Sequence, residues 1–195
     1  MLIDLLRHGE PVGGRRYRGQ TDDPLSELGW RQMWRAVGSA PPWQHIITSP
    51  LQRCRAFAEQ LGTRHSIALS EDARLMEVGF GAWEGHTADE LRRHDPEQWQ
   101  RFFADPVTHR PAGAEAIADF AARVISAWDE AVQRHDNQHL LVVCHAGVIR
   151  VIMAHVLGAP LSAMYRIQVE TATLTRICIE ADRPPTLQFH GQRLE

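Results

Sequence analysis

Residues 2–10 read Leu-Ile-Asp-Leu-Leu-Arg-His-Gly-Glu, a short and largely apolar run that is followed by Arg7, His8, Gly9 and Glu10. Residues 140–147, Leu-Leu-Val-Val-Cys-His-Ala-Gly, again place a histidine directly after an apolar run, and residues 46–48 form a third apolar run that is followed by Ser49 and Pro50. Such runs are typical of strands buried on both faces of a parallel sheet. They predict strands over residues 2–6, 46–48 and 140–144.

Amphipathic segments separate these runs and predict helices. Each of the first three predicted starts carries a capping residue or a proline at the helix entrance. The predicted helices are 26–37 with Ser26 as cap, 49–61 with Ser49 and Pro50 at its start, a helix opened by a capping box of Thr87 and Glu90, 114–135, and 148–157.

Strands that alternate with helices indicate an α/β fold with a mostly parallel sheet, right-handed crossovers and helices on both faces. Residues 173–179 alternate in polarity and predict a late antiparallel strand at the sheet edge, and residues 181–185 are expected to end the regular region. In such sheets ligands bind at the carboxyl ends of the strands. The residues that follow the strands are therefore the candidate functional residues.

The composition suits a single domain over residues 1–195, because the chain has a mass of 22.1 kDa and is 44% hydrophobic and 23% charged. The formal net charge of -3 creates no field that favours nucleic acid or an anionic membrane as a partner. All 21 basic residues are arginine. The absence of lysine excludes Schiff-base aldolases, pyridoxal phosphate enzymes and P-loop ATPases.

The three cysteines, Cys54, Cys144 and Cys178, form no CxxC pair, which favours a reducing compartment. The first residues lack the basic segment and cleavage site of a signal peptide, and no run reaches about 18 apolar residues. We therefore expect a cytoplasmic location and no membrane partner.

Four side chains suited to phosphate are expected to meet at the carboxyl edge of the sheet. Arg7 and His8 follow the first strand, Arg53 lies on the first turn of the helix after the second strand, and His145 follows residues 140–144. The planar fork of a guanidinium binds phosphate oxygens in pairs. This group predicts a site for a small phosphate ester that requires no metal ion and no other cofactor.

The chemistry of this group is nucleophilic attack on phosphorus. A neutral imidazole is a good nucleophile near pH 7, and neighbouring guanidiniums disfavour its protonated form. The arginines would neutralise the equatorial oxygens, and the second histidine would stabilise the charge of the transition state. Gly9 would let the backbone beside His8 approach the substrate and orient the ring through a carbonyl, and Gly147 would open a helix N-terminus to an oxyanion.

A general acid is needed to protonate the departing alkoxide. Residues 75–85 contain the two candidates, Glu77 and Glu84, in a glycine-rich stretch that suggests tight turns. Spacing alone does not choose between them.

Three other readings remain open. Cys144 and Arg150 have the five-residue separation used by cysteine-dependent phosphatases. A phosphate-binding protein without turnover would keep the arginines but would need neither a nucleophile nor an acid. A metal-dependent hydrolase is disfavoured because the eleven histidines show no HxH or HExxH spacing.

Four segments of the chain resemble, in order, blocks of the histidine phosphatase superfamily, also called phosphoglycerate mutase-like. The resemblance spans most of the chain and implies a three-layer α/β/α sandwich and a hydrolase that works through a phosphohistidine. It implies that His8 is the phosphorylated nucleophile, that Arg7, Arg53 and His145 form the phosphate pocket, and that Glu77 is the acid that later activates water. The segments are Arg7-His8-Gly9-Glu10, Ser49-Pro50-Leu51-Gln52-Arg53, residues 77–85 and His145-Ala146-Gly147.

Residues 17–22, Tyr-Arg-Gly-Gln-Thr-Asp, look most like the small phosphatases of the α-ribazole phosphatase type, which implies α-ribazole 5'-phosphate as a substrate. Glycolytic mutases are similar in the same blocks but usually carry Trp where this chain has Gln20, so a phosphatase is favoured over a mutase. Ala116 stands where α-ribazole phosphatases tend to have a serine. Arg18, Gln20 and Thr21 are the candidate substrate contacts, and the oligomeric state is not predicted.

Overall fold

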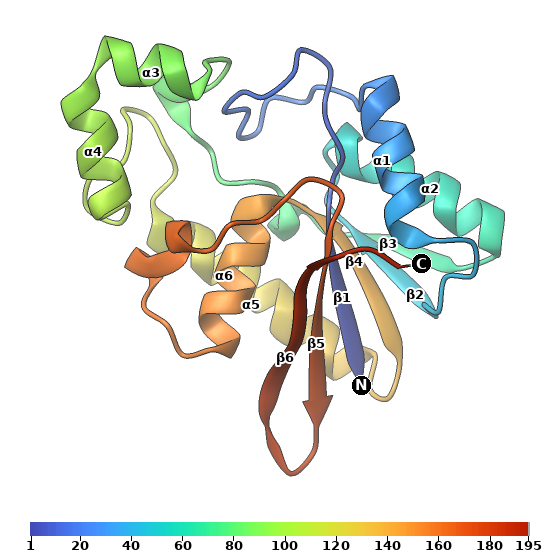
Figure 1. The fold of residues 1–195 in the computed structure, drawn as a ribbon. Coiled ribbons are helices and arrows are strands. Elements are labelled where there is room, and N and C mark those ends of the chain that lie inside the picture. Colours follow the sequence, from blue (N-terminus) through green and yellow to red (C-terminus); the bar gives the residue numbers. More distant parts are fainter. Residues whose placement is uncertain (195) are drawn as a thin grey trace.

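The computed structural model describes residues 1–194, and its strands are β1 (Leu2–Arg7), β2 (His45–Thr48), β3 (Ala68–Glu71), β4 (His139–Cys144), β5 (Leu174–Glu180) and β6 (Arg183–Gln192). They form one six-stranded sheet in the order β3-β2-β4-β1-β5-β6 (Figure 1). The first four strands are parallel, whereas β5 is antiparallel to β1 and β6 is antiparallel to β5. The predicted α/β class with a mostly parallel sheet is therefore confirmed.

Helices cover both faces of this sheet, as Figure 1 shows. The side chains of β4 alternate between the two faces: Leu140 and Val142 pack in the core beneath α5 and α6, whereas Leu141 and Val143 pack beneath α1 and α2. This alternation produces the three layers of the sandwich. The helices are α1 (Glu27–Val37), α2 (Gln52–His65), α3 (Ala88–His94), α4 (Pro96–Ala104), α5 (Ile117–Arg134) and α6 (Ala146–Val156).

The predicted starts of α1 and α3 are confirmed. Ser26 Oγ accepts a backbone N–H of the first turn of α1 at 3.0 Å, and Thr87 and Glu90 make both hydrogen bonds of the capping box at α3. The predicted long helix begins at Ile117 instead of residue 114, because Glu115 is held in backbone pairing with a distant segment. The helix expected over 148–157 begins at Ala146, directly after β4.

The prediction that residues 181–185 end the regular region is wrong. β6 occupies residues 183–192, and so β5 is an inner strand instead of the predicted edge strand. Pro184 and Pro185 obscured this strand, because proline lacks the N–H that a central strand donates but is tolerated at a sheet edge. Strand β3 and helix α4 were not predicted; both are short, at 4 and 9 residues.

The carboxyl ends of three neighbouring parallel strands meet at one edge of the sheet. His8 N–H donates to the carbonyl of Cys144, and Ser49 N–H donates to that of Val143, so the backbone ladder continues past the strand ends. The residues that follow β1, β2 and β4 are thereby brought side by side. No helix within residues 1–194 has both the length and the apolar character needed to cross a bilayer.

Candidate active site

The His8 ring directly follows β1 and is only 7% exposed. Its Nδ1 lies 2.7 Å from the carbonyl oxygen of Gly9, and because a carbonyl only accepts, Nδ1 carries the proton. Nε2 is then left with a free electron pair. Gly9 orients the ring as predicted, but the reason for glycine there differs: a Cβ at this position would lie 2.3 Å from the carbonyl oxygen of Gly29 in α1.

His145 lies at the N-terminal end of α6 and is completely buried. Its Nε2 is 2.8 Å from Ser49 Oγ, so the residue after β2 holds the ring that follows β4. The rings of His8 and His145 approach edge to face with centroids 5.2 Å apart. The two histidines that the sequence places 137 positions apart thus face one another across the sheet edge.

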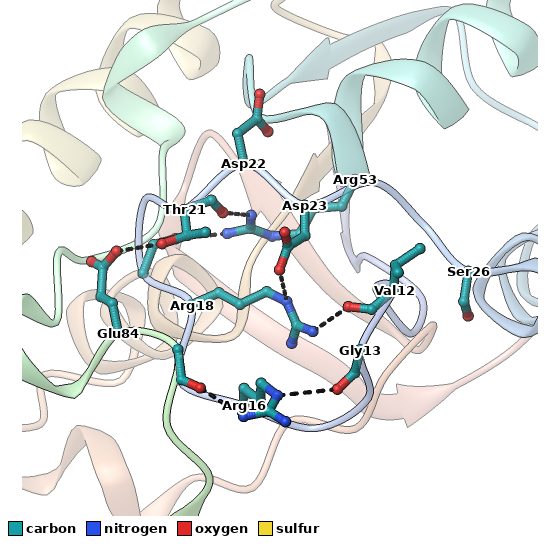
Figure 2. Close-up of polar contacts among 12 residues, drawn as sticks. Val12, Gly13, Arg16, Arg18, Thr21, Asp22, Asp23, Ser26, Arg53 and Glu84 are labelled. Carbon is teal, nitrogen blue, oxygen red and sulfur yellow. Dashed lines mark hydrogen bonds and ion pairs between the residues drawn. The ribbon is translucent and has the colours of Figure 1, made fainter.

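Arg7 and Arg53 are both held by backbone carbonyls. Arg53 donates from Nη1 to the carbonyl of Thr21 and from Nη2 to that of Gly19 at 2.7 Å each (Figure 2). Arg7 donates from Nη1 to the carbonyl of Val169. The Nε atoms of both arginines are buried without a partner among residues 1–194. Buried N–H groups almost always find an acceptor. These two donors indicate a site for an anion.

The site favours neutral imidazoles. Burial lowers the pKa of His8 and of His145 well below 6.5, and the positive charges of Arg53 and Arg7 lower both further. The sequence predicted this direction from the arginines, but burial is the larger cause. Burial and the nearby Arg150 lower the pKa of Arg7 to about 10, so this guanidinium remains charged near neutral pH.

Glu77 joins this group through the N-terminus of α6. Its Oε1 accepts the backbone N–H of Val78 at 3.0 Å, and its Oε2 accepts that of Gly147 at 3.1 Å. The expectation that Gly147 offers its N–H to a substrate oxyanion is therefore wrong, because a carboxylate of the protein occupies it. A Cβ at position 147 would lie 2.2 Å from Glu77 Oε1, so glycine is what permits this approach.

Glu84, the competing candidate for the acid, has a different task. Its carboxylate accepts from Thr21 Oγ1 at 2.8 Å and from the backbone N–H groups of Phe80 and Gln20 at 3.0 and 3.3 Å. Figure 2 shows this carboxylate turned toward the loop that carries Thr21. Glu84 thus fastens the loop whose carbonyls hold Arg53.

All three candidate substrate contacts, Arg18, Gln20 and Thr21, make hydrogen bonds within the protein. Arg18 is buried and donates from Nε to Asp23 at 2.8 Å and from Nη2 to the carbonyl of Val12 at 2.6 Å (Figure 2). Thr21 binds Glu84 as described above. Gln20 lies at the site itself, since its Nε2 is 3.3 Å from the carbonyl oxygen of Glu77.

Arg123 and Glu115 support Glu77, a role that was not predicted from the sequence. Arg123 on α5 donates to the carbonyl oxygens of Arg74, Met76 and Glu77 at 2.6 to 3.1 Å, and its Nε and Nη2 donate to the two carboxylate oxygens of Glu115. Glu115 in turn accepts the N–H of Gly79 at 3.1 Å. The available signal was an arginine beside the apolar stripe of α5, one turn after Phe120.

The cysteine-dependent reading is excluded by the surroundings of Cys144. Its side chain is fully buried in the core, and burial raises the pKa of the thiol well above 9.0, which is the opposite of what a thiolate nucleophile requires. The backbone after it enters α6 at once, and Arg150 on that helix donates to the carbonyl of Ile167 at 2.9 Å. Within residues 1–194, no three His, Cys, Asp or Glu side chains are grouped as metal ligands.

Comparisons with known proteins agree with this geometry. A family model described as the histidine phosphatase superfamily (branch 1) matches residues 3–191. A bifunctional protein of Mycobacterium tuberculosis is 32% identical over 193 residues, which cover 96% of this chain and 53% of that protein. The chain therefore spans about half the length of this curated relative and of two similar mycobacterial proteins.

Solved structures show the same fold. A protein of Bacillus stearothermophilus, YhfR, superposes with a TM-score of 0.87 at 30% identity, covering 98% of this chain and 96% of that one. A mycobacterial glucosyl-3-phosphoglycerate phosphatase superposes with a TM-score of 0.86 at 28% identity, covering 98% of each chain, and it has also been solved with inorganic phosphate.

The α-ribazole phosphatase of Shigella flexneri has a TM-score of 0.85 at 24% identity over 99% of this chain and 97% of that one. Its similarity is no greater than that of the other two structures, and so the comparisons do not single out this type. The family model spans nearly the whole sequence, and the motifs expected from the sequence meet at one edge of the sheet. The chain belongs to branch 1 of the histidine phosphatase superfamily.

Proposed function

We propose that the protein is a phosphomonoesterase that transfers the phosphoryl group of a small ester to His8 and then to water. Arg7, Arg53 and His145 bind the phosphoryl oxygens, and Glu77 is the general acid. The observation that carries this proposal is the state of His8: its protonated Nδ1 binds a carbonyl, its Nε2 is free, and a second neutral imidazole faces it.

The two steps balance in atoms and charge. In the first, Nε2 of His8 attacks phosphorus, the ester bond breaks, and the departing oxygen takes the proton of Glu77. In the second, the Glu77 carboxylate takes a proton from water, whose oxygen attacks phosphorus and breaks the phosphorus–nitrogen bond. Free phosphate leaves, and His8 is neutral again.

The test is to trap the intermediate. Rapid denaturation during turnover of p-nitrophenyl phosphate should yield a phosphoryl group that is labile to acid, stable to alkali and located on the peptide containing His8. His8→Asn should lose turnover and the trapped group, whereas the matched variant His94→Asn, at an exposed histidine, should retain both. Phosphorylation of another peptide, or full turnover in His8→Asn, would contradict the proposal.

Product analysis separates the alternatives. A phosphatase releases inorganic phosphate, a mutase passes the phosphoryl group to a second hydroxyl of the substrate, and a protein without turnover gives neither result. Turnover that survives exhaustive treatment with EDTA would support metal independence, which is proposed because two guanidiniums already supply positive charge to the site.

The proposed substrate α-ribazole 5'-phosphate depends on residues 17–22 alone. In this structure Gln20 reaches the Glu77 segment, which agrees with a role for that loop near the leaving group. The serine that α-ribazole phosphatases tend to have is Ala116 here, so one hydroxyl for substrate contact is absent. α-Ribazole 5'-phosphate should therefore be compared with other esters by kcat/KM.

A further inference from the structure

Residues 167–173, which precede β5, lie against the carboxyl end of β1. The backbone N–H of Ala172 donates to the carbonyl of Arg7 at 3.1 Å, and the backbone N–H of Arg7 donates to that of Thr173 at 3.2 Å. Within residues 1–194, the bond from Nη1 to the carbonyl of Val169 is the one side-chain hydrogen bond of Arg7. The placement of this guanidinium therefore depends on the conformation of the segment at Val169.

A histidine of β6 binds the carbonyl group just before the one that Arg7 binds. His190 Nε2 lies 2.6 Å from the carbonyl oxygen of Gln168, and His190 Nδ1 lies 2.7 Å from Thr175 Oγ1. Because a carbonyl only accepts, Nε2 carries a proton, and in the neutral ring Nδ1 then accepts from the hydroxyl of Thr175. Both ring nitrogens of His190 are thus engaged.

The position of His190 in the sheet fixes the ring from the other side. β6 is an edge strand and lies beside β5 (Figure 1). His190 and Thr175 are direct partners across these two strands, which places their side chains on the same face. Thr175 is fully buried and is in turn the partner of Leu5 in β1. His190 is therefore fastened to the same sheet that carries Arg7.

Few bond rotations separate the carbonyl that His190 binds from the carbonyl that Arg7 binds. The peptide unit is planar, so only φ and ψ of Val169 lie between the carbonyl groups of Gln168 and Val169. The Val169 side chain is 3% exposed and packs in the core, which restricts these two rotations. A hydrogen bond to the carbonyl of Gln168 thus also constrains the carbonyl of Val169.

We propose that His190 is a positioning residue for Arg7. Its Nε2–H holds the carbonyl of Gln168 and thereby keeps the carbonyl of Val169 where it orients the Arg7 guanidinium for phosphate. The proposal rests on the proposed function for the role of Arg7 in binding the phosphoryl group.

Two variants at position 190 isolate this hydrogen bond. Asparagine keeps an acceptor near the place of Nδ1 but does not reach Gln168, whereas glutamine places an N–H near that of Nε2. His190→Asn should lower kcat/KM for p-nitrophenyl phosphate about three- to tenfold, and His190→Gln should lower it less than about twofold. Gln188→Asn, which shortens an exposed side chain of the same strand, is the control and should not change kcat/KM.

The Arg7→Met background distinguishes positioning from a general effect on the fold. When the guanidinium is absent, His190→Asn should lower kcat/KM less than about twofold further, because its effect acts through Arg7. A loss by the same factor in both backgrounds would assign His190 to folding alone and overturn the proposal. An unchanged kcat/KM in His190→Asn would overturn it as well.

The tautomer of His190 provides a test that does not depend on the folding of His190→Asn. The ¹⁵N resonances of this ring in the unaltered protein at pH 8 are identified by their absence in His190→Gln. They should show a protonated Nε2 and an unprotonated Nδ1, because Nε2 faces a carbonyl. The opposite tautomer would contradict the proposed contact.

Failure of the phosphatase function is detected separately, by the dissociation constant of inorganic phosphate measured by calorimetry in the same variants. If the protein hydrolyses no ester but His190→Asn weakens phosphate binding about three- to tenfold only where Arg7 is present, the proposed function fails and the positioning role is supported. If esters are hydrolysed but His190→Asn alters neither turnover nor phosphate binding, the positioning role fails and the proposed function is retained.

Discussion

Buried charge occurs at both ends of β1, and the two ends are built in opposite ways. Toward its start, Asp4 is fully buried, and its carboxylate accepts from Arg176 Nε and Nη2, from Trp43 Nε1 and from His139 Nε2 at 2.7 to 2.9 Å. At its other end Arg7 and His8 face further cations and imidazoles, and the Nε atoms of Arg7 and Arg53 have no acceptor within residues 1–194.

This contrast distinguishes a buried charge that stabilises the fold from charges available to a ligand. Burial acts to raise the pKa of the Asp4 carboxyl group, but the hydrogen bonds from Arg176, His139 and Trp43 together outweigh this effect and lower the pKa below 3.8. The protein alone satisfies that carboxylate. At the carboxyl edge the Nε donors of Arg7 and Arg53 have no acceptor within residues 1–194, and in the proposed function this is where phosphate would bind.

The largest expected effect is on turnover at the carboxyl edge. Arg7→Met should lower kcat/KM for p-nitrophenyl phosphate by about 100-fold or more, because it removes charge that stabilises the transition state. The free energy of unfolding should change by less than about 1 kcal/mol, since one hydrogen bond and one buried cation disappear together. Kinetics and urea denaturation measure the two effects, and a large loss of stability would show that Arg7 is structural.

The reverse result is expected at the other end. Asp4→Asn should lower the free energy of unfolding by about 2–4 kcal/mol, because an amide cannot accept all the hydrogen bonds that the carboxylate accepts. The kcat/KM value should change less than about twofold, since this end is remote from the site. Asp129→Asn, at an exposed acid of α5, is the control and should alter neither quantity. A stable Asp4→Asn protein would contradict this account.

The two ends of β1 should affect the free energy of unfolding in different pH ranges. His8 and His145 have pKa values below 6.5 in the folded protein, so below pH 6.5 the unfolded chain binds more protons and stability falls as the pH falls. Each buried imidazole contributes at most about 1.4 kcal/mol per pH unit. The pKa of Asp4 is lowered, so its contribution is present above pH 3.8 and is lost only in stronger acid.

Urea denaturation between pH 5 and 7.5 tests this difference. His8→Asn should reduce the slope of stability against pH in this range, whereas Asp4→Asn should leave the slope as it is and lower the whole curve. If His8→Asn has the same slope as the unaltered protein, His8 does not stay neutral in the folded state.

The smallest effect on turnover is expected from a change in Arg123, which supports Glu77. Arg123→Lys keeps one charge but loses most of the bonds to the backbone around Glu77, so proton donation should weaken by about three- to tenfold. The loss should appear with poor leaving groups and be smaller with p-nitrophenyl phosphate, whose leaving group needs little protonation. Glu77→Gln should show the same pattern more strongly. An equal loss for all esters would assign Arg123 to folding alone.

The sequence predicted the parts of the site that depend on local rules. Arg7, His8 and His145 follow apolar runs, and the ends of neighbouring parallel strands necessarily meet, so their proximity could be expected without coordinates. Arg53 follows for a related reason, because it lies in the first turn of the helix after β2. The same rules identified the sheet and the main helices.

Glu77 and Glu84 could not be told apart by such rules. They occur in a glycine-rich segment without periodicity, and what distinguishes them is contact with remote groups, namely the N–H of Gly147 for one and the loop around Thr21 for the other. Arg123 and Glu115 were missed for the same reason, since their partners lie on a distant turn. The local sequence pattern does not indicate contacts between segments that are far apart in the chain.

The chain alone therefore determined which strands end in imidazoles and guanidiniums, and that these groups share one edge, because strand burial and parallel pairing follow from the order of residues. Tertiary structure decided that Glu77 is the carboxylate beside these groups, and which of their N–H groups bind backbone carbonyls. It also decided that the Nε atoms of Arg7 and Arg53 have no partner within residues 1–194. Those outcomes depend on packing between segments far apart in sequence, where distances of a few tenths of an ångström separate a bound group from an open one.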